Sequence, residues 1–143
     1  MSDDLATQLI KESEGCRLTA YRDSLGKFTI GVGHLLDASK DWTGYTITQE
    51  QCDSLLQADM GASRSYAAAF PHYVEMNEVR QAVCVSMCFQ LGSSPLHWPH
   101  FIAALQIPDY VAAAAAGLDS LWAQQTPARA NREMSMMQTG VWS

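Results

Sequence analysis

One strand–turn–strand pattern, set in a chain that otherwise has helical periodicity, constrains the fold most. Polar and apolar residues alternate over positions 16–21, Asp-Ser-Leu-Gly follows as a turn at 23–26, and residues 27–32 are β-branched and aromatic enough for a returning strand. A helix is expected over residues 3–14, where Gly15 ends it. The pattern predicts an α+β fold that is mostly α and has one small β-hairpin.

The segments after the hairpin predict helices. Thr48 can cap one of them, with Gln51 at the capping-box position. A second begins near residue 75 and is apolar almost all round over 82–91, which is typical of a helix buried at the centre of a bundle. Further helices are expected over residues 98–106, over 108–122 and from the pair Thr126-Pro127 onward.

No linker, repeat or low-complexity tract divides the chain, so residues 1–143 are expected to form a single domain. Within it we expect a β-hairpin lobe at about residues 16–47, with a loop over 41–45, and a helical lobe at about 60–143. The helix over 3–14 is expected to pack on the helical lobe.

The composition is that of an ordinary globular protein, with 48% hydrophobic and 17% charged residues. The longest apolar stretch falls far short of the roughly 20 residues that a membrane span needs. The N-terminal residues lack the pattern of a secretory signal, so we expect the protein in the cytoplasm. The formal net charge of −6 gives no attraction to nucleic acid, to an anionic membrane or to an anionic cell wall, so neither nucleic-acid binding nor stable membrane association is expected.

The cysteines give no sign of a metal site. Cys84 and Cys88 lie four residues apart in an expected helix, where their small apolar side chains share one face. Cys16 and Cys52 stand alone, and no C-x-x-C or Cys/His ligand spacing occurs. We therefore expect four free, buried thiols, no metal and no cofactor.

Two carboxylates and a hydroxyl near the hairpin are candidates for catalysis. Glu14 ends the first helix, where the negative end of the helix dipole favours a protonated carboxyl. Asp23 lies at the mouth of the hairpin, and the returning strand brings Thr29 towards it. Glycosidic cleavage needs such a pair in unlike surroundings, one carboxyl protonated and the other ionised. Alternatively, Glu14 is a solvent-facing acid like Glu12, and Asp23 caps its own turn.

Longer motifs around these residues resemble those of the T4-type phage lysozymes. The stretch from Glu14 to Leu36 contains E-x8-D-x5-T followed by T-I-G-x-G-H. The likeness continues in M-C-F-Q-L-G at 87–92, in W-A-Q-Q-T-P-A-R at 122–129, and in T-G-V-W near the end. It covers almost the whole chain, with the motifs in the family's order.

The resemblance implies a lysozyme-like fold of two lobes with a cleft between them. It implies hydrolysis of the β-1,4 bond between N-acetylmuramic acid and N-acetylglucosamine in peptidoglycan, with inversion at the anomeric carbon. Glu14 would be the general acid, Asp23 would act on the far side of the sugar, and Thr29 would help to hold the attacking water. Arg129 would lie beside Glu14 and support it.

Some further positions have a structural interpretation and a functional one. His34 could be a base or metal ligand, but the resemblance favours a structural ion pair with Asp59, which falls in the apolar stripe of its helix. Gln90 could line the cleft, but we favour a core hydrogen bond to the indole N–H of Trp122. For Gly31 and Gly33, hairpin flexibility and close approach of a sugar are equally open.

The resemblance also suggests a set of substrate-binding residues. These are Gly33, Leu35, Phe89, Phe101, Gln125 and Thr126. For the last two, capping of the final helix is an equally good interpretation. The methionines from Met134 to Met137 are expected in the core rather than in the site.

The expected partner is the glycan strand of peptidoglycan, and the protein is expected to be a monomer. It would accumulate in the host cytoplasm and reach the wall in the periplasm after a holin has permeabilised the inner membrane, causing host cell lysis. Two alternatives are a lytic transglycosylase and a non-catalytic or virion-structural wall-binding module of the same fold. The presence of Glu14, Asp23 and Thr29 together argues against both.

Overall fold

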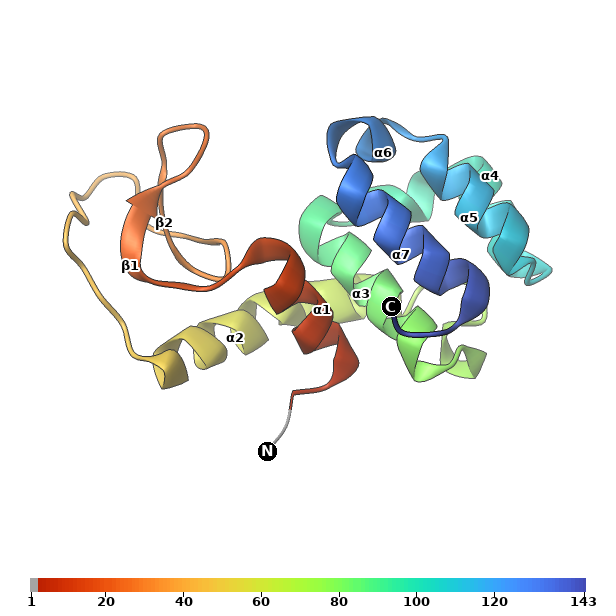
Figure 1. Cartoon of the computed structure of the whole chain (residues 1–143), viewed down its shortest axis with the longest axis horizontal. Coiled ribbons are helices and arrows are strands. Elements are labelled where there is room, and N and C mark those ends of the chain that lie inside the picture. The colour runs from red at the N-terminus through yellow and green to blue at the C-terminus, as the bar shows by residue number, and fades with distance from the viewer. Residues whose placement is uncertain (1–2) are drawn as a thin grey trace. The chain divides into compact units, whose positions relative to one another are not determined.

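The computed structural model describes residues 3–143, and it confirms a mostly helical α+β fold (Figure 1). The strands are β1 (Arg17–Arg22), β2 (Phe28–Gly31) and β3 (His34–Leu35). The α-helices are α1 (Leu5–Glu14), α2 (Gln49–Ala67), α3 (Glu78–Leu91), α4 (Pro99–Gln106), α5 (Tyr110–Leu118), α6 (Leu121–Gln125) and α7 (Pro127–Thr139), and the 3-10 helices are η1 (Tyr73–Glu75) and η2 (Ser94–His97).

The chain forms two compact units. We call residues 10–61 the hairpin unit, and the described residues 3–9 and 62–143 the helical unit. In the part of the chain that the structure describes, no helix is both long and apolar enough to cross a membrane.

The hairpin unit contains an antiparallel sheet in the order β1-β2-β3, with β1 and β2 drawn in orange in Figure 1. Tyr21 pairs with Thr29 across the first hairpin, and Thr29 pairs with Leu35 across the second. The third strand was not predicted, because it is only two residues long and follows a turn built on two glycines. The loop expected over 41–45 is confirmed, and Thr46, directly after it, forms an antiparallel bridge with Thr19.

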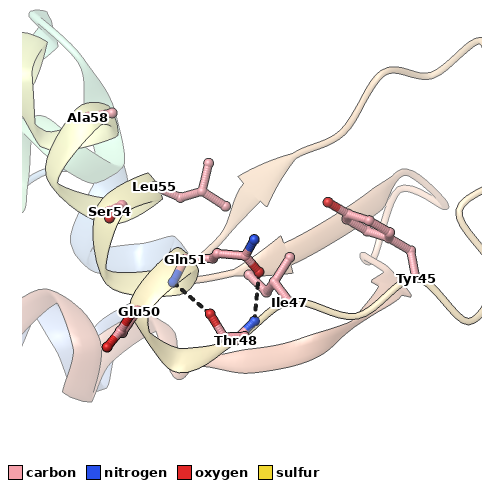
Figure 2. Close-up of a pocket in the computed structure, with 8 residues that line it drawn as sticks. All are labelled: Tyr45, Ile47, Thr48, Glu50, Gln51, Ser54, Leu55 and Ala58. Carbon is pink, nitrogen blue, oxygen red and sulfur yellow. Dashed lines mark hydrogen bonds between the residues drawn. The ribbon is translucent and has the colours of Figure 1, made fainter.

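Helix α2 begins with the predicted capping box. The Thr48 amide donates to Gln51 Oε1 at 2.9 Å, and the Gln51 amide donates to Thr48 Oγ1 at 3.1 Å (Figure 2). This reciprocal pair satisfies two amides at a helix end that would otherwise lack partners. It confirms the start of α2 predicted from the sequence.

In the helical unit, α3 is the buried helix that its apolar surface predicted. Its residues from Ala82 to Cys88 are all buried, and so are Met134, Met136 and Met137 of α7. Gly117 of α5 packs so closely on Met134 that an added Cβ would overlap its sulfur. The methionines are therefore core residues, as expected.

The expected helix over 108–122 is wrong, because the chain breaks it into α5 and α6. Asp109 caps α5 by accepting from the Ala112 amide at 3.0 Å. Ser120 then accepts from the Ala123 amide at 3.2 Å and donates to the Gly117 carbonyl at 2.6 Å, which ends one helix and begins the next. Because the preceding alanines predict a continuous helix, the cap at Ser120 was not predicted from the sequence.

Candidate active site

Glu14, Asp23 and Thr29 all belong to the hairpin unit. Glu14 is the last residue of α1, and its side chain is exposed. Its carboxylate lies against the turn between β2 and β3, since a Cβ added to Gly33 would lie 3.6 Å from Glu14 Oε2. The helix end therefore presents this carboxyl to the side of the small sheet.

Asp23 organises the turn of the first hairpin. Its Oδ1 accepts hydrogen bonds from the Leu25 amide at 2.9 Å and the Lys27 amide at 2.8 Å. Its own amide donates to the Lys27 carbonyl at 2.8 Å. Asp23 thus stabilises the turn. Both side-chain hydrogen bonds end on Oδ1, so Oδ2 can accept a hydrogen bond from another group.

Thr29 is buried, with 3% of its surface exposed, and its hydroxyl donates to the Lys27 carbonyl at 3.1 Å. Because the proton is used in this bond, the hydroxyl oxygen is available as an acceptor, for instance from water. Thr29 pairs with Tyr21, which is two residues before Asp23. Asp23 follows β1 directly and its amide bonds to the Lys27 carbonyl, so strand alternation continued by one residue predicts Asp23 and Thr29 on the same face of the hairpin.

Gly31 and Gly33 flank the second turn with φ angles of 65° and 69°, a region that favours glycine. The backbone itself thus explains the glycine at both positions. Gly33 is also exposed and next to the Glu14 carboxylate, so both interpretations of this motif have a structural basis at that position.

Replacing Gly33 by alanine tests two effects separately: the effect of backbone strain on stability, and the effect on activity of a methyl group beside Glu14. The positive φ should lower the free energy of unfolding by about 1–2 kcal/mol, and the methyl group should reduce lytic activity by filling space that substrate would occupy beside the carboxylate, 3.6 Å away. Gly26→Ala is the matched control, because its φ is 78° and nothing lies within 4 Å of an added Cβ. Chemical unfolding and a lysis assay should show equal destabilisation but a loss of activity only in Gly33→Ala; equal activity would refute the obstruction.

The structure brings His34 and Asp59 together. His34 Nδ1 lies 2.8 Å from Asp59 Oδ2, and each side chain is about one-third exposed. The contact links β3 to α2 within the hairpin unit. An imidazole held in this way ties the second turn, and with it Gly33, to the helix.

A hollow of about 620 Å³ lies elsewhere on the hairpin unit, at the start of α2 (Figure 2). It is lined by Tyr45, Ile47, Thr48, Glu50, Gln51, Ser54, Leu55 and Ala58. None of the candidate catalytic residues is among them, and Thr48 and Gln51 are engaged in the capping box. The carboxylate chemistry, rather than this hollow, identifies the candidate site.

In the helical unit, the end of α3 meets the start of α6 and α7. Trp122 Nε1 donates to Gln90 Oε1 at 2.8 Å, and Gln90 Nε2 donates to Thr126 Oγ1 at 3.4 Å. Thr126 Oγ1 donates in turn to the Trp122 carbonyl at 3.1 Å, so its side chain does not cap α7. Gln90 has the core hydrogen bond that we favoured.

Phe101 lies in the core rather than on a binding surface. Only 1% of its surface is exposed, and its ring contacts Phe70 and Trp98 at centroid distances of 5.9 Å. A ring covered in this way offers a saccharide no surface. By contrast, Leu35 is 55% exposed, Gln125 is exposed and Phe89 is half-buried.

In a comparison with known proteins, the family model described as phage lysozyme matches residues 11–134. The chain belongs to the phage lysozyme family. It is 25% identical to a probable T4-type lysozyme of Dictyostelium discoideum, over 93% of each chain. It is 35% identical to the endolysin of Salmonella phage P22, over 79% of this chain and 77% of that protein. The motif-based resemblance is confirmed, and the protein is a lysozyme-type hydrolase.

A third relative occurs in a different setting. The pre-baseplate central spike protein Gp5 of Enterobacteria phage T4 is 29% identical over 93% of this chain, which spans 27% of that protein. Sequence similar to this chain therefore makes up most of one relative, the P22 endolysin, and about a quarter of another, the longer T4 spike protein.

This phage lysozyme contains a buried acid, Glu133, that the sequence analysis missed. Glu133 is fully buried in α7, where its Oε2 accepts from Arg129 Nε at 2.9 Å and from Ser86 Oγ at 3.0 Å. Arg129 also donates to Ser86 Oγ at 3.0 Å. Arg129, Glu133 and Ser86 thus form a closed triangle, and among the described residues Glu133 Oε1 is a buried oxygen without a hydrogen-bond partner. The expected contact of Arg129 with Glu14 stays a prediction.

Burial raises the pKa of Glu133 above its ordinary value of 4.5, against the opposing effects of Arg129 and Ser86. As the pH rises above 4.5, the glutamate of the unfolded chain loses its proton while buried Glu133 keeps its own. The free energy of unfolding therefore falls as the pH rises towards the raised pKa of Glu133. The slope contributed by this one group is at most about 1.4 kcal/mol per pH unit. Glu133→Gln, which cannot ionise, should gain stability relative to wild type as the pH increases from about 4.5.

Urea unfolding at several pH values measures this difference. Glu75→Gln is the control for the loss of one acid, because Glu75 is an exposed glutamate of the same unit. A wild-type profile parallel to that of Glu133→Gln would contradict the raised pKa. A difference of opposite sign would mean that the attraction of Arg129 outweighs burial.

Proposed function

We propose that this lysozyme hydrolyses the β-1,4 bond between N-acetylmuramic acid and N-acetylglucosamine in peptidoglycan, with Glu14 as the general acid. The observation that supports this most is the grouping of Glu14, Asp23 and Thr29 in one compact unit. There the Glu14 carboxylate lies beside the Gly33 turn, and Asp23 and Thr29 share one face of the hairpin.

In this mechanism, Glu14 begins protonated and donates its proton to the glycosidic oxygen as the bond from that oxygen to the anomeric carbon breaks. A water molecule attacks the anomeric carbon from the opposite face. The Thr29 oxygen accepts a hydrogen bond from this water, because the proton of its own hydroxyl is committed to Lys27. Ionised Asp23 accepts the proton that the water loses, which completes an inverting hydrolysis.

The hairpin turn fixes the direction of the Asp23 carboxyl group. Its Oδ1 accepts from two backbone amides, which holds the side chain in one orientation. Oδ2 is then the oxygen that faces the water. The turn therefore positions the base and leaves one of its oxygens for the reaction.

We further propose that the protein acts alone, as a monomer, on wall glycan after a holin-type protein releases it from the host cytoplasm. The P22 relative is named an endolysin, which supports this route. The T4 relative is named a spike protein, which supports a virion-borne copy instead. Detection of the protein in purified particles would favour the second route.

The products formed from purified peptidoglycan test the proposed reaction. Hydrolysis adds water, so mass spectrometry should find fragments that end in reducing N-acetylmuramic acid. Fragments that end in anhydro-muramic acid would identify a transglycosylase and overturn the role of water. Intact glycan after prolonged incubation with folded protein would identify a non-catalytic binding module.

A further inference from the structure

Two cysteines that the sequence analysis treated as isolated lie in contact. Cys16 Sγ is 2.8 Å from Cys52 Sγ, although both are free thiols. Cys16 immediately precedes β1 and is exposed, whereas Cys52 is fully buried in the first turns of α2. The four thiols are free, as expected, but Cys16 is exposed rather than buried, and Cys16 and Cys52 do not stand alone.

Contacts that do not involve sulfur hold the two cysteines together. Lys11 Nζ forms an ion pair with Asp53 Oδ1 at 3.0 Å, which joins the end of α1 to the residue after Cys52. The Ile47 amide donates to the Leu18 carbonyl at 2.9 Å, which joins β1 to the segment that leads into α2. The backbone on both sides of each cysteine is thus anchored within the hairpin unit.

We propose that Cys16 and Cys52 form an intramolecular disulfide when the protein meets an oxidising disulfide compound. A disulfide bond is about 2.05 Å long, so the sulfurs have to move together by less than an ångström. The bond would close residues 17–51 into a covalent loop that contains Asp23 and Thr29. Only the place of oxidation rests on the proposed function, because a wall hydrolase works outside the reducing cytoplasm.

The positions of the two thiols determine the order of the reaction. Burial and the neighbouring Cys16 raise the pKa of Cys52 to about 12, so Cys52 is a poor first nucleophile. The thiolate of the exposed Cys16 attacks one sulfur of oxidised glutathione and releases one glutathione thiolate. Cys52 then gives up its proton and attacks Cys16 Sγ, which expels the second glutathione thiolate. Two protein thiols are oxidised and one glutathione disulfide is reduced to two thiols.

The other two cysteines provide an internal control. Cys84 and Cys88 are buried in α3, where Cys84 Sγ contacts Met76 Sδ at 3.7 Å. Burial raises the pKa of Cys88 to about 12 and also raises that of Cys84. This pair offers no exposed thiolate that could attack a disulfide oxidant, so both should remain thiols.

The test compares the full chain under dithiothreitol with the same protein equilibrated with oxidised glutathione. After denaturation and alkylation, the oxidised protein should show two modified thiols instead of four, and peptide mapping should join Cys16 to Cys52. Its thermal midpoint should be about 5–10 °C higher than that of the reduced protein, because the loop restricts the unfolded chain. Cys16→Ser, at an exposed position, should remove both effects, and Cys84→Ala should retain both.

Four alkylated thiols after oxidation would overturn the proposal, as would a bridge to another cysteine or a glutathione adduct that stays on Cys16. An unchanged thermal midpoint would equally refute closure of the loop. The comparison of reduced with oxidised wild type needs no substitution, so a variant that fails to fold does not obscure the result. None of these measurements uses lytic activity, so the disulfide and the proposed function can fail separately.

Discussion

Glu14→Gln is expected to lower the rate at which the protein clears outer-membrane-permeabilised cells by about a hundredfold to ten-thousandfold. Glutamine has the shape of a protonated glutamate but has no acidic proton to donate, so the glycosidic oxygen would leave unprotonated. Glutamine keeps the size and shape of the side chain at this exposed position at the end of α1, so the free energy of unfolding should change little. A loss of turbidity measures the activity, and chemical unfolding measures the stability.

Glu12→Gln is the matched control for this prediction. Glu12 is an exposed acid on the same helix, two residues from Glu14, and its replacement removes the same charge. It should clear cells at close to the wild-type rate. Equal clearing by Glu14→Gln and wild type would contradict the assignment of the general acid, whatever the product analysis shows.

The candidate site was predictable from the sequence because its parts are close together along the chain. Glu14, Asp23 and Thr29 lie on one helix end and the hairpin that follows it, so local rules were sufficient to place them in one unit. The alternation of residues predicted the hairpin, and the turn at Asp23 predicted where it closes. The turn-forming role of Asp23 is observed and uses one carboxylate oxygen, whereas its catalytic role stays a prediction.

The features that were missed depend on contacts between distant segments. Ser86 and Glu133 are 47 positions apart, and Cys16 and Cys52 are 36 apart, so no local pattern reveals either pair. A buried glutamate also opposes the usual tendency of acids to lie at the surface. The only local sign of Glu133 was its position four residues after Arg129, next to the methionines of α7.

The break between α5 and α6 has a different cause. A run of alanines predicts a continuous helix, and no propensity argument stops it before Trp122. Ser120 stops it by forming side-chain bonds at 2.6 Å to the preceding turn and at 3.2 Å to the following one. A serine inside a helical pattern can take part in such a cap, but the sequence does not show when it will.

Asp23→Asn and Asp23→Ala should separate the two roles of this residue. The asparagine side chain keeps an oxygen that can accept from the Leu25 and Lys27 amides, so the turn should remain and the stability should hardly change. Its amide cannot take a proton from water, so lytic activity should fall by about a hundredfold or more. Alanine lacks both functions, and the free energy of unfolding should also fall by about 1–2 kcal/mol.

Asp41→Asn is the matched control, because Asp41 forms a similar turn in the same unit. Its Oδ1 accepts from the Thr43 amide at 3.0 Å and from the Thr43 hydroxyl at 2.6 Å. The substitution removes the same charge at a turn without a proposed catalytic role, so activity should be retained. Full activity of Asp23→Asn would mean that this residue only forms the turn, and the attacking water would then need another base. Unchanged stability of Asp23→Ala would show instead that the hairpin closes without its side chain, which would leave catalysis as the reason for an aspartate at this position.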